Sequence, residues 1–301
     1  MLFYALRLAN ALKPQGIGIV VGHEADRVKA AVQQMAKEAG ITRPIAFIHQ
    51  KKALGSGNAV LESIPFLKKF GMALVLCGDT PLLTYESVHG LVQSHAGQKG
   101  PVTLLTAKLG QPKGYGRVIR SPLGEVLRIV EESVGSPKEL VVNEINSGAY
   151  CFQVENLLSG VKEIGAKGPK KEHFLTDILE ILRAKGGKIN AYVSQSPEEV
   201  LGVNSRVQLS NVERIANRRI LERLMLSGVT ILDPASTYVD CDVEVGQDSI
   251  IYPGTILRGR TRIGRLCRIG PFCHVEDSQI GDDCEVRMSQ VAGARLLEKC
   301  H

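Results

Sequence analysis

Short apolar runs alternate with longer amphipathic stretches through the first 110 residues. The apolar runs cover 17–21, 45–48, 74–77 and 102–107, and the amphipathic stretches cover 1–13, 24–39, 58–70 and 85–95. Apolar runs of this length are typical of strands buried in a parallel sheet, and apolar positions three and four residues apart predict helices. The alternation therefore predicts an α/β domain, a doubly wound and mostly parallel sheet with helices on both faces. Such a domain usually opens with a strand, whereas this sequence opens on a predicted helix.

The hydrophobic pattern changes its period near residue 233. Apolar residues recur there at a strict interval of six, and after one slip the interval resumes at two further positions: Val239, Val245, Ile251, Leu257, Ile263, Ile269, Val275, Ile280 and Val286. A helix repeats every 3.6 residues and a strand every two, so neither keeps a period of six on one face. The period predicts a short parallel β-helix of hexapeptide repeats, with three hexapeptides in each coil.

One long predicted helix, 206–226, separates these two patterns. Its apolar positions form a single stripe, which is typical of an amphipathic helix. We therefore expect three parts: an α/β domain over 1–204, a helical linker over 205–228 and a partial β-helix over 229–301.

Composition narrows the class of protein. The chain has 301 residues, 44% of them hydrophobic and 23% charged, and no apolar run of about 18 residues that would insert into a membrane. A net charge of +6 mildly favours anionic ligands, but without Trp and with 5% aromatic residues the chain does not predict nucleic-acid binding. Seven cysteines without a C-x-x-C pair predict reduced thiols in a cytoplasmic protein and no zinc site.

Two oxygen-bearing side chains stand where a parallel sheet usually binds ligands. Asp79 follows the predicted strand 74–77, and Asn204 follows the apolar stretch 200–203. A carboxylate at the carboxyl end of a strand suits Mg²⁺, which prefers oxygen ligands. Each residue has an alternative interpretation, because Asp and Asn are also favoured caps of the helix that follows.

A glycine-rich turn, Leu54-Gly-Ser-Gly-Asn58, precedes the predicted helix 58–70. Glycines allow close backbone approach, and the exposed N–H groups of such a turn can contact a base or a phosphate. Taken alone, this glycine-rich motif predicts a tight turn but not a binding site.

Taken together, the motifs resemble one family. In chain order they are Gln50-x-x-x-Leu-Gly-Ser-Gly-Asn-Ala59, Leu76-Cys-Gly-Asp79-Thr-Pro-Leu82, Gly114-Tyr-Gly-Arg117, Ile129-Val-Glu131, Glu144-Ile-Asn146-Ser-Gly148, Leu175-Thr-Asp177 and Gly202-Val-Asn204-x-Arg206. With the long helix and the period of six, this order is similar to that of the bifunctional bacterial N-acetylglucosamine-1-phosphate uridyltransferases / glucosamine-1-phosphate acetyltransferases.

The resemblance implies a uridyltransferase domain that forms UDP-N-acetylglucosamine and pyrophosphate from UTP and N-acetylglucosamine 1-phosphate. It implies Mg²⁺ held by Asp79 and Asn204, a left-handed β-helix and a homotrimer formed through that β-helix. The substrate contacts that it implies are Gln50, Gly55 and Ser56 for the uracil and Gly116, Glu131 and Asn146 for the sugar. Gly78 and Asn204 are implied as further substrate-binding residues. Glu132 is interpreted as a surface carboxylate.

The sequence also departs from the family pattern. The family's glycine-rich loop with its Arg and Lys is expected before Met1, and the coils that bind acetyl-CoA are expected after His301. On this interpretation we expect at most trace uridyltransferase activity and no acetyltransferase activity. Two alternatives stay open, namely a transferase for another sugar 1-phosphate and base, and a non-catalytic hexapeptide-repeat scaffold.

Overall fold

The computed structural model describes residues 1–166 and 172–301, which form two compact units, Met1–Asn204 and Ser205–His301. No helix in the described part of the chain is both long enough and apolar enough to cross a membrane. None of the seven cysteines, which all lie in the described part of the chain, forms a disulfide bond.

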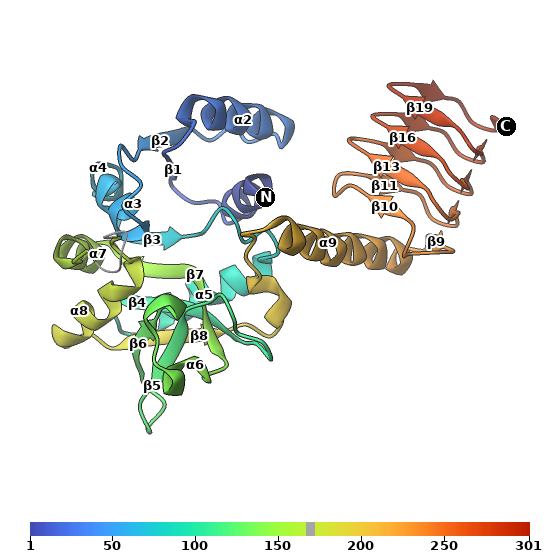
Figure 1. Cartoon of the computed structure of the whole chain (residues 1–301). Coiled ribbons are helices and arrows are strands. Elements are labelled where there is room, and N and C mark those ends of the chain that lie inside the picture. Colours follow the sequence, from blue (N-terminus) through green and yellow to red (C-terminus); the bar gives the residue numbers. More distant parts are fainter. Residues whose placement is uncertain (167–171) are drawn as a thin grey trace. The chain divides into compact units, whose positions relative to one another are not determined.

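The first unit begins with a small parallel sheet (Figure 1). Strand β1 (Ile17–Val21) pairs with β2 (Ile45–His49), and helices α1 (Leu2–Ala11) and α2 (Ala25–Glu38) pack against this pair. The buried side chains at this contact are Leu6, Ile17, Val32 and Ala36. The amphipathic stretches 1–13 and 24–39 thus bury their apolar faces as the sequence predicts.

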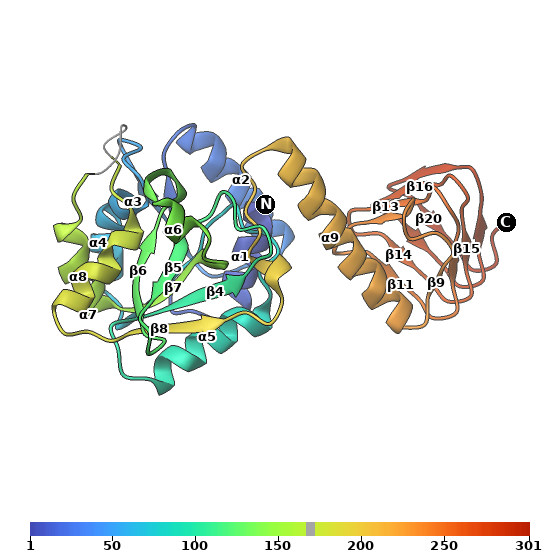
Figure 2. The ribbon, with the colours of Figure 1, turned by 60° about the horizontal axis from the view of Figure 1, so that its bottom comes forward.

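A six-stranded mixed sheet forms the centre of the first unit. Its order is β6-β5-β7-β4-β8, and β3 also pairs with β7. The strands are β3 (Met72–Val75), β4 (Val102–Lys108), β5 (Arg117–Arg120), β6 (Val126–Val130), β7 (Glu144–Gln153) and β8 (Ile189–Val193). Figure 2 shows β6, β5 and β7 side by side.

The expectation of a mostly parallel sheet is wrong for this part of the chain. Within the six strands only β4 and β8 pair in parallel, and β7 runs antiparallel to β3, β4 and β5. The short turn 121–124 folds β5 back on β6 as an antiparallel pair, with Ser121 N–H donating to the Glu125 carbonyl at 2.8 Å. A connection of this length cannot provide the crossover that parallel strands need.

Helices cover both faces of this sheet. They are α3 (Ser56–Glu62), α4 (Ile64–Leu67), α5 (Tyr85–Gly97), α6 (Pro137–Leu140), α7 (Val154–Gly160) and α8 (Ile178–Ala184), with single 3₁₀ turns at Glu132–Val134, Val161–Glu163, Leu175–Asp177 and Pro197–Val200. Side chains alternate across the strands, so Leu104 and Phe152 face α7 and α8 whereas Leu105 and Cys151 face α5.

Two predicted boundaries also change. The helix predicted over 58–70 is two helices that meet at Ser63, with Pro65 in the first turn of α4, where a missing N–H is tolerated. The strand predicted over 74–77 lies two residues earlier, at Met72–Val75. Leu76 and Cys77 therefore leave the sheet and lead into Gly78 and Asp79.

The second unit begins with α9 (Arg206–Leu226) and continues as short parallel strands. In chain order they are β9 (Thr230–Ile231), β10 (Tyr238–Val239), β11 (Glu244–Val245), β12 (Ile250–Ile251), β13 (Ile256–Arg258), β14 (Arg262–Ile263), β15 (Arg268–Ile269), β16 (His274–Glu276), β17 (Gln279–Ile280), β18 (Glu285–Val286), β19 (Gln290–Ala292) and β20 (Arg295–Leu296). They form three sheets of four strands each, seen as stacked rungs in Figure 1. This arrangement fits a β-helix.

The register explains both the period and its slip. Glu244 pairs with Arg262, which pairs with Gln279, which pairs with Arg295, so the step between coils falls from 18 residues to 17 and then 16. The apolar residue of each strand points inward, and Ile251, Leu257, Ile269 and Val275 are fully buried. Each sheet therefore contributes one apolar residue per coil to a continuous core.

The corners of the coil turn at residues with positive φ. Three columns of such residues, with φ between +43° and +71°, contain Asp248, Leu266, Asp283 and Lys299, then Gly254, Phe272 and Met288, then Gly259, Asp277 and Gly293. Bulky residues rarely adopt this conformation. Here the corner leaves the Phe272 and Met288 side chains 71% and 75% exposed.

Candidate functional site

The glycine-rich turn is closed by the backbone of a distant segment. Gly57 N–H donates to the His173 carbonyl at 2.7 Å, and His173 N–H donates to the Leu54 carbonyl at 2.7 Å. Gly55 has φ of +95°, and a Cβ at this position would lie 2.7 Å from the His173 carbonyl oxygen. Only glycine fits both the conformation and the close approach.

Gln50 and Ser56 hold this turn in place. The Gln50 amide donates to the Gly55 carbonyl at 3.0 Å and to Asn58 Oδ1 at 2.9 Å, and Ser56 Oγ accepts from Leu175 N–H at 3.0 Å. The structure therefore brings together the three residues expected at the base. Gln50 Nε2 is already engaged, so its Oε1 is the side-chain atom left for a ligand.

A second group of candidate residues meets at the end of β6. Asn146 N–H donates to the Gly116 carbonyl at 2.9 Å, and the Thr176 hydroxyl donates to Glu131 Oε1 at 2.9 Å. A Cβ at Gly116 would lie 3.4 Å from Glu131 Oε2 and 2.8 Å from Ile129. Gly116, Glu131 and Asn146, expected at the sugar, thus lie together.

The environment of Glu131 makes its carboxyl easier to protonate than a carboxyl in water. Burial raises the pKa of this carboxyl, the negative charge of Asp177 raises it further, and the hydrogen bond from Thr176 partly opposes both effects. A desolvated carboxyl group that has one neutral hydrogen-bond donor suits recognition of sugar hydroxyl groups.

A bulge in β7 sets the direction of Asn146. The register between β4 and β7 shifts between Leu104 and Thr106, so Tyr150 lies opposite Leu104 and Asn146 lies opposite Thr106. Gly148 in the bulge has φ of +78°. Bulges re-aim side chains next to binding sites, and here the Asn146 side chain is half-buried and reachable.

Asp79 and Asn204 belong to segments that a backbone hydrogen bond joins. Val203 N–H donates to the Asp79 carbonyl at 3.0 Å, which places Asn204 one residue from this contact. The helix-cap alternatives are wrong for both residues. Thr84 caps α5 by accepting from Ser87 N–H, and Ser205 caps α9 by accepting from Gln208 N–H. Helix capping therefore accounts for neither Asp79 nor Asn204.

The donor set at this junction fits a hard divalent cation. Asp79 is half-buried next to the exposed Gly78, and in the described part of the chain no hydrogen bond or ion pair of its carboxylate is recorded. The same part holds no group of three or more His, Cys, Asp or Glu residues that could enclose a metal. One carboxylate and one amide suit Mg²⁺, which completes its shell with water and substrate phosphate.

Residues 1–196 match the family model described as nucleotidyl transferase. The chain belongs to the nucleotidyl transferase family. Relatives named Bifunctional protein GlmU are 44% identical in Caldanaerobacter subterraneus over 98% of this chain and 63% of the relative, 39% identical in Halalkalibacterium halodurans over 99% and 64%, and 41% identical in Clostridioides difficile over 93% and 59%. This nucleotidyl transferase therefore spans about 60% of the length of the curated relatives that it matches.

Cys77 lies inside the site of this nucleotidyl transferase without the properties of a nucleophile. Its thiol donates to the Gly148 carbonyl, with 3.5 Å between Sγ and the oxygen. Burial, and to a lesser degree the charge of Asp79, raises the pKa of Cys77 to about 11. The thiol stays protonated at neutral pH, and only a thiolate would attack a substrate.

Some polar contacts were missed from the sequence. Glu132, interpreted as a surface carboxylate, keeps a side chain that is 34% exposed, but it also accepts a hydrogen bond from Gly114 N–H and lies 4.0 Å from the buried Arg117. Tyr115 of the same turn accepts from Gly202 N–H at 3.1 Å. These contacts tie the turn that carries Gly116 to the segment that carries Asn204.

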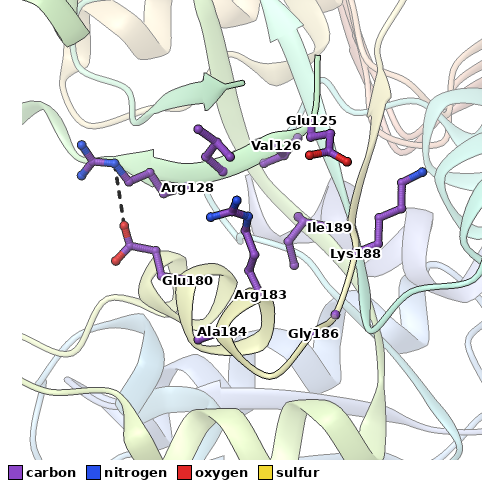
Figure 3. Close-up of a pocket in the computed structure, with 11 residues that line it drawn as sticks. Glu125, Val126, Arg128, Glu180, Arg183, Ala184, Gly186, Lys188 and Ile189 are labelled. Carbon is purple, nitrogen blue, oxygen red and sulfur yellow. Dashed lines mark ion pairs between the residues drawn. The ribbon is translucent and has the colours of Figure 1, made fainter. Parts of the chain in front are cut away.

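A cavity lies elsewhere on the first unit, away from these residues. It has a volume of about 740 Å³ and is lined by β6, α8 and the start of β8 (Figure 3). Arg128 and Glu180 form an ion pair at its edge, with 3.7 Å between Nε and Oε1. None of the sequence-predicted site residues lines this cavity. Its size therefore does not identify it as the place of the chemistry.

Proposed function

We propose that the first unit transfers a uridylyl group from UTP to N-acetylglucosamine 1-phosphate, forming UDP-N-acetylglucosamine and pyrophosphate. Membership of the nucleotidyl transferase family supports the reaction class. The relatives named Bifunctional protein GlmU, together with the motifs of the sequence, support these substrates.

One observation carries the proposal. The hydrogen bond between Val203 and Asp79 joins two segments that are 124 residues apart in the sequence, and neither Asp79 nor Asn204 caps a helix. Two oxygen-bearing side chains that cap no helix, on joined segments whose Cys77 donates to the Gly148 carbonyl next to the Asn146 group, support a place for the phosphates near the sugar site. We propose Asp79 and Asn204 as the ligands of Mg²⁺.

The transfer needs no nucleophile from the protein. An oxygen of the sugar phosphate attacks the α-phosphorus of UTP in line and forms the new P–O bond. The bond from the α-phosphorus to the bridging oxygen breaks, and its electron pair leaves with pyrophosphate. Glu131 and Asn146 would orient the sugar, and the turn at Gly55 would orient the base, so that the reacting atoms are held in line. Bound Mg²⁺ would supply charge neutralisation on the phosphates.

We further propose that the second unit is a left-handed β-helix of hexapeptide repeats that assembles as a homotrimer. The exposed side chains of Phe272 and Met288 on one corner column support a protein contact there, because clustered apolar side chains mark interaction surfaces. Sedimentation at several concentrations tests the assembly. A trimer that weakens on dilution supports it, and a monomer or a tight dimer contradicts it.

The reaction is tested by nucleotide binding first and by turnover second. Titration calorimetry with Mg²⁺ compares UTP, TTP and ATP, and pyrophosphate release is then assayed with N-acetylglucosamine 1-phosphate and glucose 1-phosphate. We expect UTP to bind at least about tenfold more tightly than the other two. A preference for TTP or ATP would favour a different sugar nucleotidyltransferase, and no binding of any of the three would favour a scaffold.

A further inference from the structure

Tyr150 reaches the candidate sugar site although it lies four residues beyond Asn146. In a regular strand this separation spans about 13 Å, yet Asn146 Nδ2 and Tyr150 Oη are 2.6 Å apart. The bulge provides the explanation, because these two residues of β7 lie opposite Leu104 and Thr106, which are only two apart on β4. The bulge in β7 thus brings the Asn146 and Tyr150 side chains into hydrogen-bonding contact.

The contacts of Asn146 define which way its amide faces. Gly148 N–H lies 3.1 Å from Asn146 Oδ1. A backbone N–H can only donate, so the oxygen of the amide must face Gly148 and its nitrogen must face Tyr150. The Tyr150 hydroxyl therefore accepts from one N–H of the amide, and the second N–H stays available for a ligand.

The Tyr150 ring is well placed to act as a fixed support. The residue is 3% exposed, and its ring packs on Phe152 with 5.6 Å between ring centroids. A side chain packed in this way loses little further conformational entropy when a ligand binds, and it holds its hydrogen-bond partner in one orientation.

We infer that Tyr150 is a positioning residue for sugar recognition, because it anchors the Asn146 amide so that the free N–H of Asn146 points at an oxygen of the sugar moiety. This inference rests on the proposed function of the same site. It adds to that function a residue that touches no substrate and acts only through Asn146.

The inference predicts a selective loss of affinity. Tyr150→Phe keeps the ring and its packing but removes the acceptor, so the Asn146 amide keeps only the hydrogen bond from Gly148 N–H and loses part of its preorganisation. We expect the affinity for UDP-N-acetylglucosamine to fall about three- to tenfold, the range for one neutral hydrogen bond. The affinity for UDP, which lacks the sugar, should stay within twofold.

Titration calorimetry with Mg²⁺ on the full chain tests this with the wild type, Tyr150→Phe, Asn146→Ala and the double variant. Tyr85→Phe is the matched control, since it removes a hydroxyl from a residue that is 43% exposed and stacks on His89. We expect Tyr150→Phe to have no further effect once Asn146 is alanine, because Tyr150 acts through Asn146.

Each other outcome has a distinct meaning. If Tyr150→Phe weakens UDP and UDP-N-acetylglucosamine equally, or if the two substitutions are additive, Tyr150 is only structural and the inference is overturned. If the wild type binds UDP but gains nothing from the sugar, Asn146 does not contact the sugar and the inference fails while nucleotide binding stands. If the wild type binds neither ligand, the proposed function fails and the inference fails with it.

Discussion

At the residue scale, Glu131 combines a cost in stability with the role in sugar binding that we propose for it. Burial raises the pKa of its carboxyl, so the folded state holds the proton more tightly than the unfolded state does. The stability that this proton provides is fully present below the ordinary carboxyl pKa and is lost as pH rises through the raised value. At neutral pH the buried negative charge is therefore unfavourable to folding.

Glu131→Gln should separate the two effects. The amide can still accept from Thr176 but carries no charge, so we expect the free energy of unfolding at pH 7 to stay equal or rise, with a smaller difference from wild type at pH 4. We expect binding of UDP-N-acetylglucosamine to weaken at least about tenfold, because a hydrogen bond to a charged group is lost. Urea unfolding at both pH values and calorimetry measure this, and a loss of stability at pH 7 would contradict it.

His95 provides the opposite pH dependence. It is 1% exposed, its Nδ1 is 3.0 Å from Thr103 Oγ1, and burial lowers the pKa of its imidazole. The unfolded state therefore takes up a proton near pH 6.5 that the folded state resists, and stability falls as pH decreases below that value by up to about 1.4 kcal/mol per pH unit.

His95→Gln should flatten this part of the pH profile. Urea unfolding between pH 7.5 and 5.5 measures it, and His23→Gln, which changes an exposed histidine, is the control. Equal slopes for the wild type and His95→Gln would show that His95 is not the group responsible.

The sequence pattern locates a residue in the fold where that residue lies at the end of an element that the pattern reveals. The spacing placed Asp79 after a strand and Asn204 before a helix, and the structure joins their segments. Tyr150 and Glu132 could not be found in this way, because their contacts depend on a bulge and on a turn closed by a residue 18 positions away. Neither the bulge nor the turn contact is marked by a periodic pattern of apolar residues in the sequence.

At the element scale, the turn at 54–57 depends on the absence of a side chain. Gly55→Ala would place a Cβ 2.7 Å from the His173 carbonyl oxygen at a φ of +95°. We expect a loss of about 1–3 kcal/mol in the free energy of unfolding and loss of nucleotide binding. Gly110→Ala is the control, because a Cβ there meets no atom within 4 Å. Equal effects on nucleotide binding would contradict the role of the turn.

Some strands of the first unit can be predicted from the sequence and others cannot, and the difference has a physical reason. Strands such as β1, β2 and β4 are mostly apolar, so they stand out. β7 is also largely buried but contains Asn146, Ser147 and Gly148, whose polar groups are satisfied locally or by the neighbouring strand, as when the Ser147 hydroxyl donates to the Leu105 carbonyl of β4 at 2.7 Å. A buried strand whose polar residues form hydrogen bonds inside the protein cannot be recognised from its hydrophobicity alone.

At the scale of the whole molecule, the second unit depends on stacking, because each coil contacts only its neighbours. Ile251 is fully buried between Ile231 and Ile269 of the adjacent strands. We expect Ile251→Ala to cost about 2–5 kcal/mol. Leu266→Ala, at a corner and 56% exposed, should cost at most about 0.5 kcal/mol. Unfolding followed by hydrogen exchange in 229–301 measures both, and similar costs would contradict an inward-facing core.

The central claim concerns Asp79, and Mg²⁺-dependent binding of UTP tests it most directly. Titration calorimetry would compare the wild type, Asp79→Ala and Asp26→Ala with Mg²⁺ and with EDTA; Asp26 is a control whose side chain is 99% exposed. We predict that Mg²⁺ tightens UTP binding at least about tenfold in the wild type and Asp26→Ala, and that Asp79→Ala loses this gain. If Asp79→Ala keeps the full effect of Mg²⁺, Asp79 is not the metal ligand and the account of the site is wrong.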